Sequence, residues 1–293
     1  MPLTPRRPLF ALLLMLLATV SFIAMQAVVK RAREAGLDPL AVMFFRTAPG
    51  LPFLGWALLR RGQSLKPEMP VNLFVRSLFG SVAMATNFTA MRSLSLGQFS
   101  TLQLSQPVFV AMIAPLLLKE RVRAATWLAM AFAAAGALVL LSPWQEHSHV
   151  RPFAASLGIA SALSSAFAMI WVRKATETDP AERVVFHFAA WVSIGSLAVG
   201  LASGRFVHLH ELAAPQTLVL WTLCMAGFGT LGQVLMTRAY VHGEATLVSI
   251  VGYSGVLLNM LLDAALFDVA PASTALLGAC LMVAAAVIIL RRG

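Results

Sequence analysis

The sequence predicts an all-α integral membrane protein with ten transmembrane helices, arranged as two inverted repeats of five helices each. Two observations predict this fold. Hydrophobic residues make up 59% of the 293 residues and charged residues only 12%, and the mean hydropathy is +0.81. So little polar surface cannot cover a soluble globule of this size. The second observation is that short patterns in the first half recur, in the same order, in the second half.

Ten apolar segments are long enough to cross a hydrocarbon core of ~30 Å, which takes about 20 helical residues. They lie near residues 8–29, 40–59, 71–91, 97–118, 124–142, 153–172, 184–203, 214–236, 245–267 and 271–290. The first follows Arg6 and Arg7 as the apolar core of a signal peptide would, but it continues to about Val29 and nine more follow. We therefore expect it to be retained as a spanning helix. Only the short break from Asp268 to Pro271 separates the last two.

The repeat is carried largely by polar and proline residues. The matched pairs are Asp38-Pro39 with Asp179-Pro180, Phe45-Arg46 with Phe186-His187 (both 141 apart), Val28-x-Lys30 with Val172-x-Lys174 (144 apart), and Arg92 to Gly97 with Arg238 to Gly243 (146 apart). Chance is the alternative, because any two membrane helices share Leu, Ala and Val. Changes in loop length would make a duplicated unit drift in this way while keeping its order. We divide the chain into repeats at 1–148 and 149–293.

An odd number of helices per repeat determines the relation between the repeats. After five crossings the second unit begins on the opposite side, so the two halves are related by an axis in the membrane plane. Lys and Arg number 14 on the side of the N-terminus and 6 on the other. The positive-inside rule then places both termini in the cytoplasm. We attribute the formal net charge of +10 and the pI near 11.0 to this asymmetry and expect no nucleic-acid partner.

The fourth and second apolar segments carry a family resemblance. Residues 98–121 contain Pro107-Val108-Phe109-Val110 and Leu118-Lys119-Glu120-Arg121, which resemble the fourth-helix signature of EamA-type carriers in the drug/metabolite transporter superfamily. Phe45-Arg46 resembles the second-helix arginine of that family. In the ninth segment Gly255 stands where the repeated proline would be, and Asp268 stands where Glu120 would be. The resemblance implies a secondary transporter of small organic solutes, with a central cavity lined by helices one to four and six to nine.

Ionisable residues inside the predicted spans are candidates for the transport pathway. Such a group costs from ~2.5 kcal/mol upward in a membrane, so it needs a partner or a wet cavity. The candidates are Arg46, Arg76, His187 and Asp263. Arg46 and His187 are repeat mates, and we expect both to face the cavity; the alternative is that Arg46 extends toward the interface and bonds loop carbonyls. Asp263 is the candidate for proton coupling.

Uncharged polar residues add further pathway candidates in both halves. Asn87 and Gln233 are repeat mates that could bind a polar solute, or could simply join helices by hydrogen bonds. Two stripes at helical spacing are also expected to line the pathway rather than form polar contacts in the core: Ser100, Gln103 and Gln106 with Pro107, and Thr246, Ser249 and Tyr253. Pro107 also frees a backbone carbonyl and permits a bend.

Other motifs do not predict an enzyme or a cofactor. Gly227 to Gly232 fits GxGxxG, but it lies in an apolar helix without a preceding strand, so we interpret it as close helix packing. The loops with His147 and His149, and with His208 and His210, could together bind a metal, but solvated loops explain them as well. Cys224 and Cys280 lie in predicted helices and are interpreted as packing residues.

The sequence leaves two functional classes open. One is a transporter, secondary active or facilitative, that moves a small polar organic metabolite by alternating access. We expect an amino-acid-like solute and export. The other is a membrane sensor or assembly subunit that retains the carrier fold without transport. The expected location is the cell inner membrane, and the expected partners are the bilayer and the solute; a homodimer is left open.

Overall fold

The computed structural model describes residues 7–90, 105–120, 123–141, 152–206 and 214–255, with a few isolated positions outside these ranges. Within them the chain forms helices and no strand. The elements are α1 (Pro8–Glu34), α2 (Pro39–Thr47), α3 (Gly50–Arg60), α4 (Pro70–Ala90), α6 (Ser105–Leu118), α7 (Ala124–Leu141), α8 (Pro152–Ala175), α9 (Ala181–Ala202), α11 (Pro215–His242), α12 (Ala245–Ile250) and the 3₁₀ turn η1 (Val251–Tyr253).

Prolines and glycines mark the helix limits. Helices α1, α2, α4, α8 and α11 each begin at a proline, which fits the first helical position because its missing N–H has no partner there anyway. Helices α1, α3 and α9 are followed by Gly36, Gly62 and Gly204, with φ of 101°, 67° and 66°. A glycine in this left-handed region lets the chain close the helix, as when Leu37 N donates to Ala32 O at 2.9 Å.

The helices from α1 to α11 lie in the first eight predicted segments, and α12 lies at the start of the ninth. Five are long and apolar enough to cross a membrane: Pro8–Glu34, Pro39–Arg60, Pro152–Ala175, Ala181–Ala202 and Pro215–His242. Helix α4 is more polar, but its 21 residues reach ~31 Å at the usual helical rise. Ser105–Leu118 and Ala124–Gly136 are shorter apolar helices. The last two predicted segments lie mostly outside the described residues, so the count of ten stays a prediction.

The second predicted span is interrupted in the middle. The sequence predicts one helix near residues 40–59, whereas the structure divides it into α2 and α3 around Ala48 and Pro49. Pro49 has no N–H to donate, and its ring would collide with the carbonyl one turn earlier. This interruption places Arg46 in the last turn of α2, one turn before the break.

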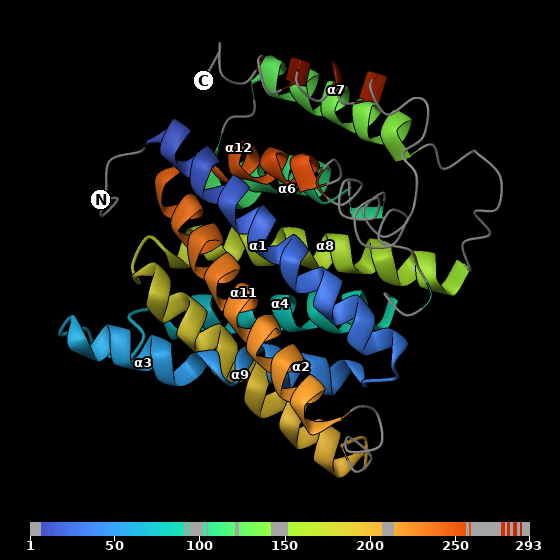
Figure 1. The fold of residues 1–293 in the computed structure, drawn as a ribbon. Coiled ribbons are helices and arrows are strands. Elements are labelled where there is room, and N and C mark those ends of the chain that lie inside the picture. Colours follow the sequence, from blue (N-terminus) through green and yellow to red (C-terminus); the bar gives the residue numbers. More distant parts are fainter. Residues whose placement is uncertain are drawn as a thin grey trace.

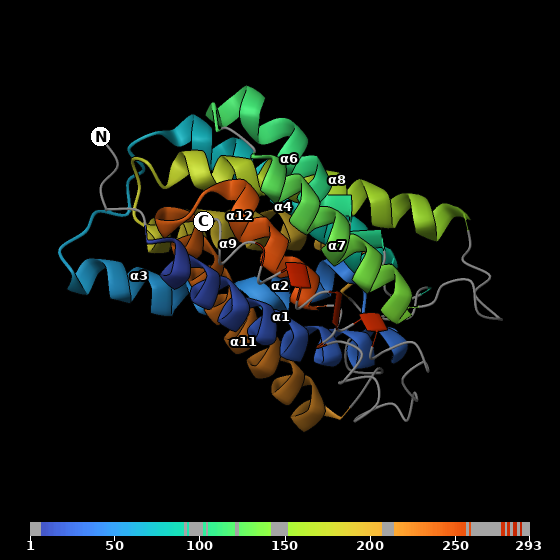
Figure 2. The same ribbon diagram turned by 90° about the horizontal axis from the view of Figure 1, so that it is seen from above.

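Each of the main helix pairs joins one helix of the first half to one helix of the second half. Helix α1 runs along α11, α4 runs along α8, and α2 packs on α9 (Figure 1). In the predicted repeat α1 corresponds to α8 and α4 to α11, so a two-fold relation would produce these pairings. The hydroxyls of Thr47 in α2 and Ser193 in α9 are 2.8 Å apart at this contact. Viewed from above, α6 and α8 lie on the opposite side of the bundle from α11 (Figure 2).

The connections gather at two ends of the bundle. At one end, which we call the Glu182 end, Arg61 bonds Glu182, and the backbone N–H of Ala245 donates to the Glu120 carboxylate. At the other, the Asp38 end, Arg33 Nε donates to Phe88 O at 3.1 Å. Connections that the predicted topology places on the same side of the membrane therefore contact one another in the structure. The positive-inside rule assigns the Glu182 end to the cytoplasm, and this orientation stays a prediction.

Candidate functional site

A cavity of about 240 Å³ lies inside the bundle, between two apolar clusters of the core. The cluster toward the Asp38 end includes Val29, Leu37 and Phe88, and the cluster toward the Glu182 end includes Leu14 and Tyr240. The cavity wall comes from α1, α2, α4, α6, α8, α9, α11 and the segment after α12. The site therefore lies deep in the bundle and draws residues from both halves of the chain.

Arg46 lies in this cavity and is almost fully buried, with 4% of its surface exposed. Its Nε lies 2.8 Å from Met25 Sδ, and its Nη1 lies 3.0 Å from Met84 Sδ. A thioether is a weak acceptor, so these contacts compensate a buried cation poorly. Gly229 of α11 makes room for the side chain, since a Cβ there would lie 2.9 Å from Arg46 Cγ.

Arg76 of α4 is the second buried cation of the cavity, with 1% exposed. Its guanidinium lies 3.6 Å from the ring centre of Phe188, and Nη2 donates to Gln233 Oε1 at 3.1 Å. Its Nε and Nη1 have no hydrogen-bond partner among the described residues. Gly80, one turn along α4, provides space because a Cβ there would overlap Arg76 Nη1. Arg76 thus holds unused donors inside an apolar bundle.

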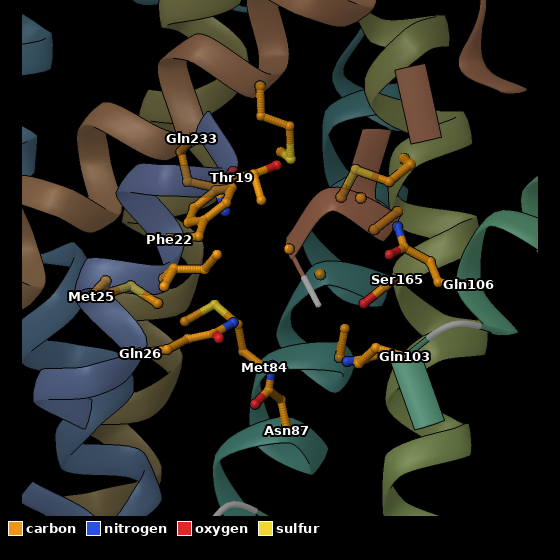
Figure 3. A pocket seen from close by; sticks show the side chains of 18 of the residues that line it. Thr19, Phe22, Met25, Gln26, Met84, Asn87, Gln103, Gln106, Ser165 and Gln233 are labelled. Carbon is orange, nitrogen blue, oxygen red and sulfur yellow. The ribbon is translucent and has the colours of Figure 1, made fainter. Parts of the chain in front are cut away.

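Amide side chains supply unused acceptors in the same cavity. Asn87 Oδ1 and Gln103 Oε1 are buried without a partner in the described part of the chain. The amide nitrogen of Gln103 donates to Ser161 Oγ at 3.2 Å, which fixes its orientation. In Figure 3 Asn87 and Gln103 lie toward the same part of the cavity, on different helices. Buried polar atoms are seldom left unsatisfied, so these acceptors need an explanation.

The structure brings together eight of the thirteen residues that the sequence singles out for the pathway and coupling. The cavity is lined by Arg46, Arg76, Asn87, Gln103, Gln106, Pro107, Gln233 and Tyr253. Ser100 and Asp263 lie outside the described residues, as do Asp268 and the four loop histidines. His187, Thr246 and Ser249 are described but are not among the described residues of the wall. The part that any of them plays in transport stays a prediction.

His187 and Ser249 make hydrogen bonds away from the described cavity wall. His187 Nε2 lies 2.7 Å from Leu65 O, in the connection after α3, so the ring is bonded at the Glu182 end. Ser249 is buried and donates to Thr246 O within α12. Helix α12 gives way to a 3₁₀ turn that ends at Tyr253, which changes the spacing expected for a continuous stripe.

Several wall residues were not predicted as pathway residues. Gln26, Thr19 and Phe22 project from α1, across the cavity from Gln106 and Ser165 (Figure 3). Gln26 could have been found, because it is the one amide in the first predicted span. The aromatic and small residues carry no such signal. They could not be told from ordinary packing residues.

The glycine-rich pattern of α11 lies against the cavity. Gly229 makes room for Arg46, and a Cβ at Gly232 would lie 2.7 Å from the ring of Phe22. Nothing lies within 4 Å of a Cβ built at Gly227. Two of the three glycines therefore permit close approach of other helices, as small residues do in membrane bundles.

Buried arginines at the Glu182 end have carboxylate partners, whereas the two cavity arginines have none among the described residues. Arg183 Nη1 lies 3.0 Å from Asp179 Oδ1, and the Asp179 side chain is fully buried. The other Asp179 contacts are the backbone N–H groups of Glu68 and Met69 and the hydroxyl of Thr178. Asp179 therefore joins the start of α9 to the connection between α3 and α4.

A second carboxylate joins three helices at the same end. Glu182 pairs with Arg61 at 2.9 Å and also contacts Arg238, linking α3, α9 and α11. Arg173 of α8 lies 3.7 Å from Glu120, an ion pair too long for a hydrogen bond. The Arg61–Glu182 contact is a charge-assisted hydrogen bond that joins the two halves of the chain at this end.

Membrane transporters have polar cavities of this kind inside their helical bundles. The family model of the EamA-like transporter family matches the chain twice, over residues 9–142 and 152–291. The chain belongs to this family, as the resemblance of its fourth segment predicted. Membership indicates a transporter, rather than an enzyme, embedded in a membrane and acting on a small molecule.

Characterised relatives and a solved structure agree with this assignment. The chain is 30% identical over 249 residues to the pseudopaline exporter CntI of Pseudomonas aeruginosa, covering 84% of each protein. It is 25% identical over 296 residues to a riboflavin transporter of Rhizobium johnstonii, covering 98% of this chain and 93% of that one. A crystal structure with 18% identity superposes with a TM-score of 0.73 over 95% of both chains, which shows the shared fold.

Proposed function

We propose that this protein exports a small polar organic metabolite across the cytoplasmic membrane, with the cavity between α1, α4, α6, α8 and α11 as its substrate site. The observation that carries the proposal is a set of buried polar atoms in that cavity, on Arg76, Asn87 and Gln103, that have no hydrogen-bond partner among the described residues. A purely structural interior would tend to pair or lose such groups, because each costs free energy when buried alone. A solute that binds and leaves gives them a partner.

Alternating access is the mechanism that we propose for this transport. The packing of α2 on α9 supports it, because corresponding segments of the two repeats meet there, with Thr47 and Ser193 bonded across the contact. Two ion pairs of the Glu182 end, Arg61–Glu182 and Arg173–Glu120, support it too, since each joins one half of the chain to the other and must separate for that end to open. Rocking of one repeat against the other would exchange the open and closed ends.

Metabolite profiling tests this function whatever the substrate is. Medium and cells are compared between a deletion strain, a strain with the wild-type chain and one with Arg46→Met, at matched membrane levels. We expect one small polar compound to rise in the medium with the wild type and not with the variant. An unchanged profile in all three strains would refute the proposal and favour a non-transporting membrane protein. The name of the exporter relative supports the chosen direction.

A further inference from the structure

The cavity holds two positive charges and, in the described part of its wall, no negative one. We propose that its substrate is a compact amino-dicarboxylate, a solute with two carboxylates and an amino group, with Arg76 as the anchor of one carboxylate. This inference rests on the proposed function and deepens it, because it names the substrate class of the same site.

The two buried arginines supply the first argument. The described lining contains Arg46 and Arg76 but no Asp or Glu. Neither guanidinium has a carboxylate within ion-pair distance among the described residues, whereas Arg183 at the Glu182 end has one. Unpaired buried cations are unfavourable and repel each other across a medium of low dielectric constant. A ligand with two carboxylates would neutralise both.

The unused hydrogen-bonding atoms supply a second argument. They include donors and acceptors, so the solute must carry groups of both kinds. Arg76 Nε and Nη1 can only donate, so they call for acceptors such as carboxylate oxygens. Asn87 Oδ1 and Gln103 Oε1 can only accept, so they call for N–H or O–H donors. An ammonium group carries three such donors. The same molecule must therefore present acceptors to α4 near Phe188 and donors to the two amides.

The size of the cavity limits the solute. Its volume of about 240 Å³ lies below the roughly 300–1,000 Å³ of pockets that hold drug-sized ligands. A solute on the scale of a single amino acid fits this space. The methionines Met25, Met84, Met169 and Met236 line the remaining wall, and such flexible side chains adapt to a short aliphatic chain.

A matched set of probes tests the class directly on the purified full-length chain in detergent. Aspartate, glutamate and 2-aminoadipate vary the length of an amino-dicarboxylate. Glutamine and 4-aminobutyrate each lack one carboxylate of glutamate, and glutarate lacks its amino group. We expect the best amino-dicarboxylate to bind at least about tenfold more tightly than its analogue lacking any one group, by calorimetry, since each lost contact involves a charged group. Equal or tighter binding of the deleted analogues would overturn the proposal.

Substitutions in the chain test which residue binds each carboxylate and the amino group of the solute. Arg76→Gln should abolish the preference for glutamate over glutamine, whereas Asn87→Leu should reduce the preference for glutamate over glutarate. Arg205→Ala, at an exposed loop position, should keep both preferences. Asp263→Asn tests whether a carboxylate of the chain neutralises the arginines: if its binding to the probes becomes tighter than that of the wild type, Arg76 and Arg46 already have a counter-ion and the proposal is wrong.

Failure of this inference can be told from failure of the proposed function. If profiling identifies an exported compound that is neutral or cationic, and no amino-dicarboxylate binds, the transport function stands and the substrate class is wrong. If no compound is exported and no probe binds, both are wrong. Binding of an amino-dicarboxylate without export would support the site and refute transport.

Discussion

Two groups of buried arginines in this protein have opposite surroundings. At the Glu182 end Arg183 is paired with a fully buried Asp179, and the buried Arg173 lies 3.7 Å from Glu120. In the cavity Arg46 contacts two thioethers, and Arg76 lies on an aromatic ring with unused donors. We interpret the paired charges as structural, and we propose that the cavity charges, which have no carboxylate partner among the described residues, bind a solute. Substitutions at the two places should therefore change different properties.

The largest expected effect is on stability, at the paired group. Asp179→Asn removes the charge that faces Arg183, whose side chain is only 7% exposed, and weakens the contacts of the carboxylate with the 68–69 backbone. Breaking a buried ion pair by removing one partner costs about 3–5 kcal/mol. The variant should show a clearly lower thermal midpoint in detergent, measured by tryptophan fluorescence. A midpoint equal to that of the wild type would mean that this pair does not stabilise the fold.

The second-largest effect is expected on transport, when the cavity residue Arg46 is replaced. Arg46→Met removes the cavity charge and keeps an unbranched side chain of comparable length between Met25 and Met84. Loss of a hydrogen bond to a charged group costs about 1.5–3 kcal/mol, or roughly 10- to 150-fold in affinity. Export of the metabolite found by profiling should fall by a similar factor, and the thermal midpoint should be unchanged or raised. Normal export by a stable Arg46→Met protein would argue against a substrate contact.

A smaller effect is expected where the space around Arg76 is reduced. A Cβ at Gly80 would overlap Arg76 Nη1 and lie 2.7 Å from Phe188 Cε2, so Gly80→Ala should displace the guanidinium. We expect a severalfold loss of export, smaller than for Arg46→Met, because the charge remains and the long side chain can adjust. Gly227→Ala is the matched control, since nothing lies within 4 Å of that Cβ. Equal export by both alanine variants would show that the position of Arg76 is unimportant.

The smallest effect belongs to an exposed pair. Arg205 lies 3.8 Å from Asp38 and its side chain is 55% exposed. Exposed ion pairs contribute about 0–1 kcal/mol. Arg205→Ala should leave both the thermal midpoint and export close to the wild type, in parallel assays. A large loss would mean that the Asp38 end is closed by this contact.

The sequence predicted the apolar spans because length and hydropathy are local properties. The helix limits were predicted only approximately: the first span was expected to end near residue 29, whereas α1 continues to Glu34 before Gly36 closes the helix. The break at Pro49 was missed because the apolar segments on its two sides together have the length of one span, although the proline itself was the available signal. Local patterns therefore predicted where helices lie better than where one is interrupted.

The site was predicted in part, because spacing along one helix does not determine which neighbours a side chain meets. The repeat paired Arg46 with His187, but Arg46 meets Gly229 of α11, whereas His187 meets a loop carbonyl. Arg76 stood out as an ionisable residue within a span, yet no matching residue in the second half suggested a role. Its stacking on Phe188 and its bond to Gln233 are tertiary contacts, which become visible only in the folded chain.

The most direct test of the division between structural and substrate-binding charges compares one arginine of each group in one assay. Arg76→Gln and Arg183→Gln proteins are reconstituted in liposomes at equal folded amounts, and transport of the metabolite found by profiling is measured beside their thermal midpoints. We predict that Arg76→Gln loses at least about tenfold in transport and keeps its midpoint, because Arg76 has no carboxylate partner among the described residues. Arg183→Gln should lose stability and keep most of its transport per folded molecule. The reverse result, with Arg76 needed for stability and Arg183 for transport, would contradict that division.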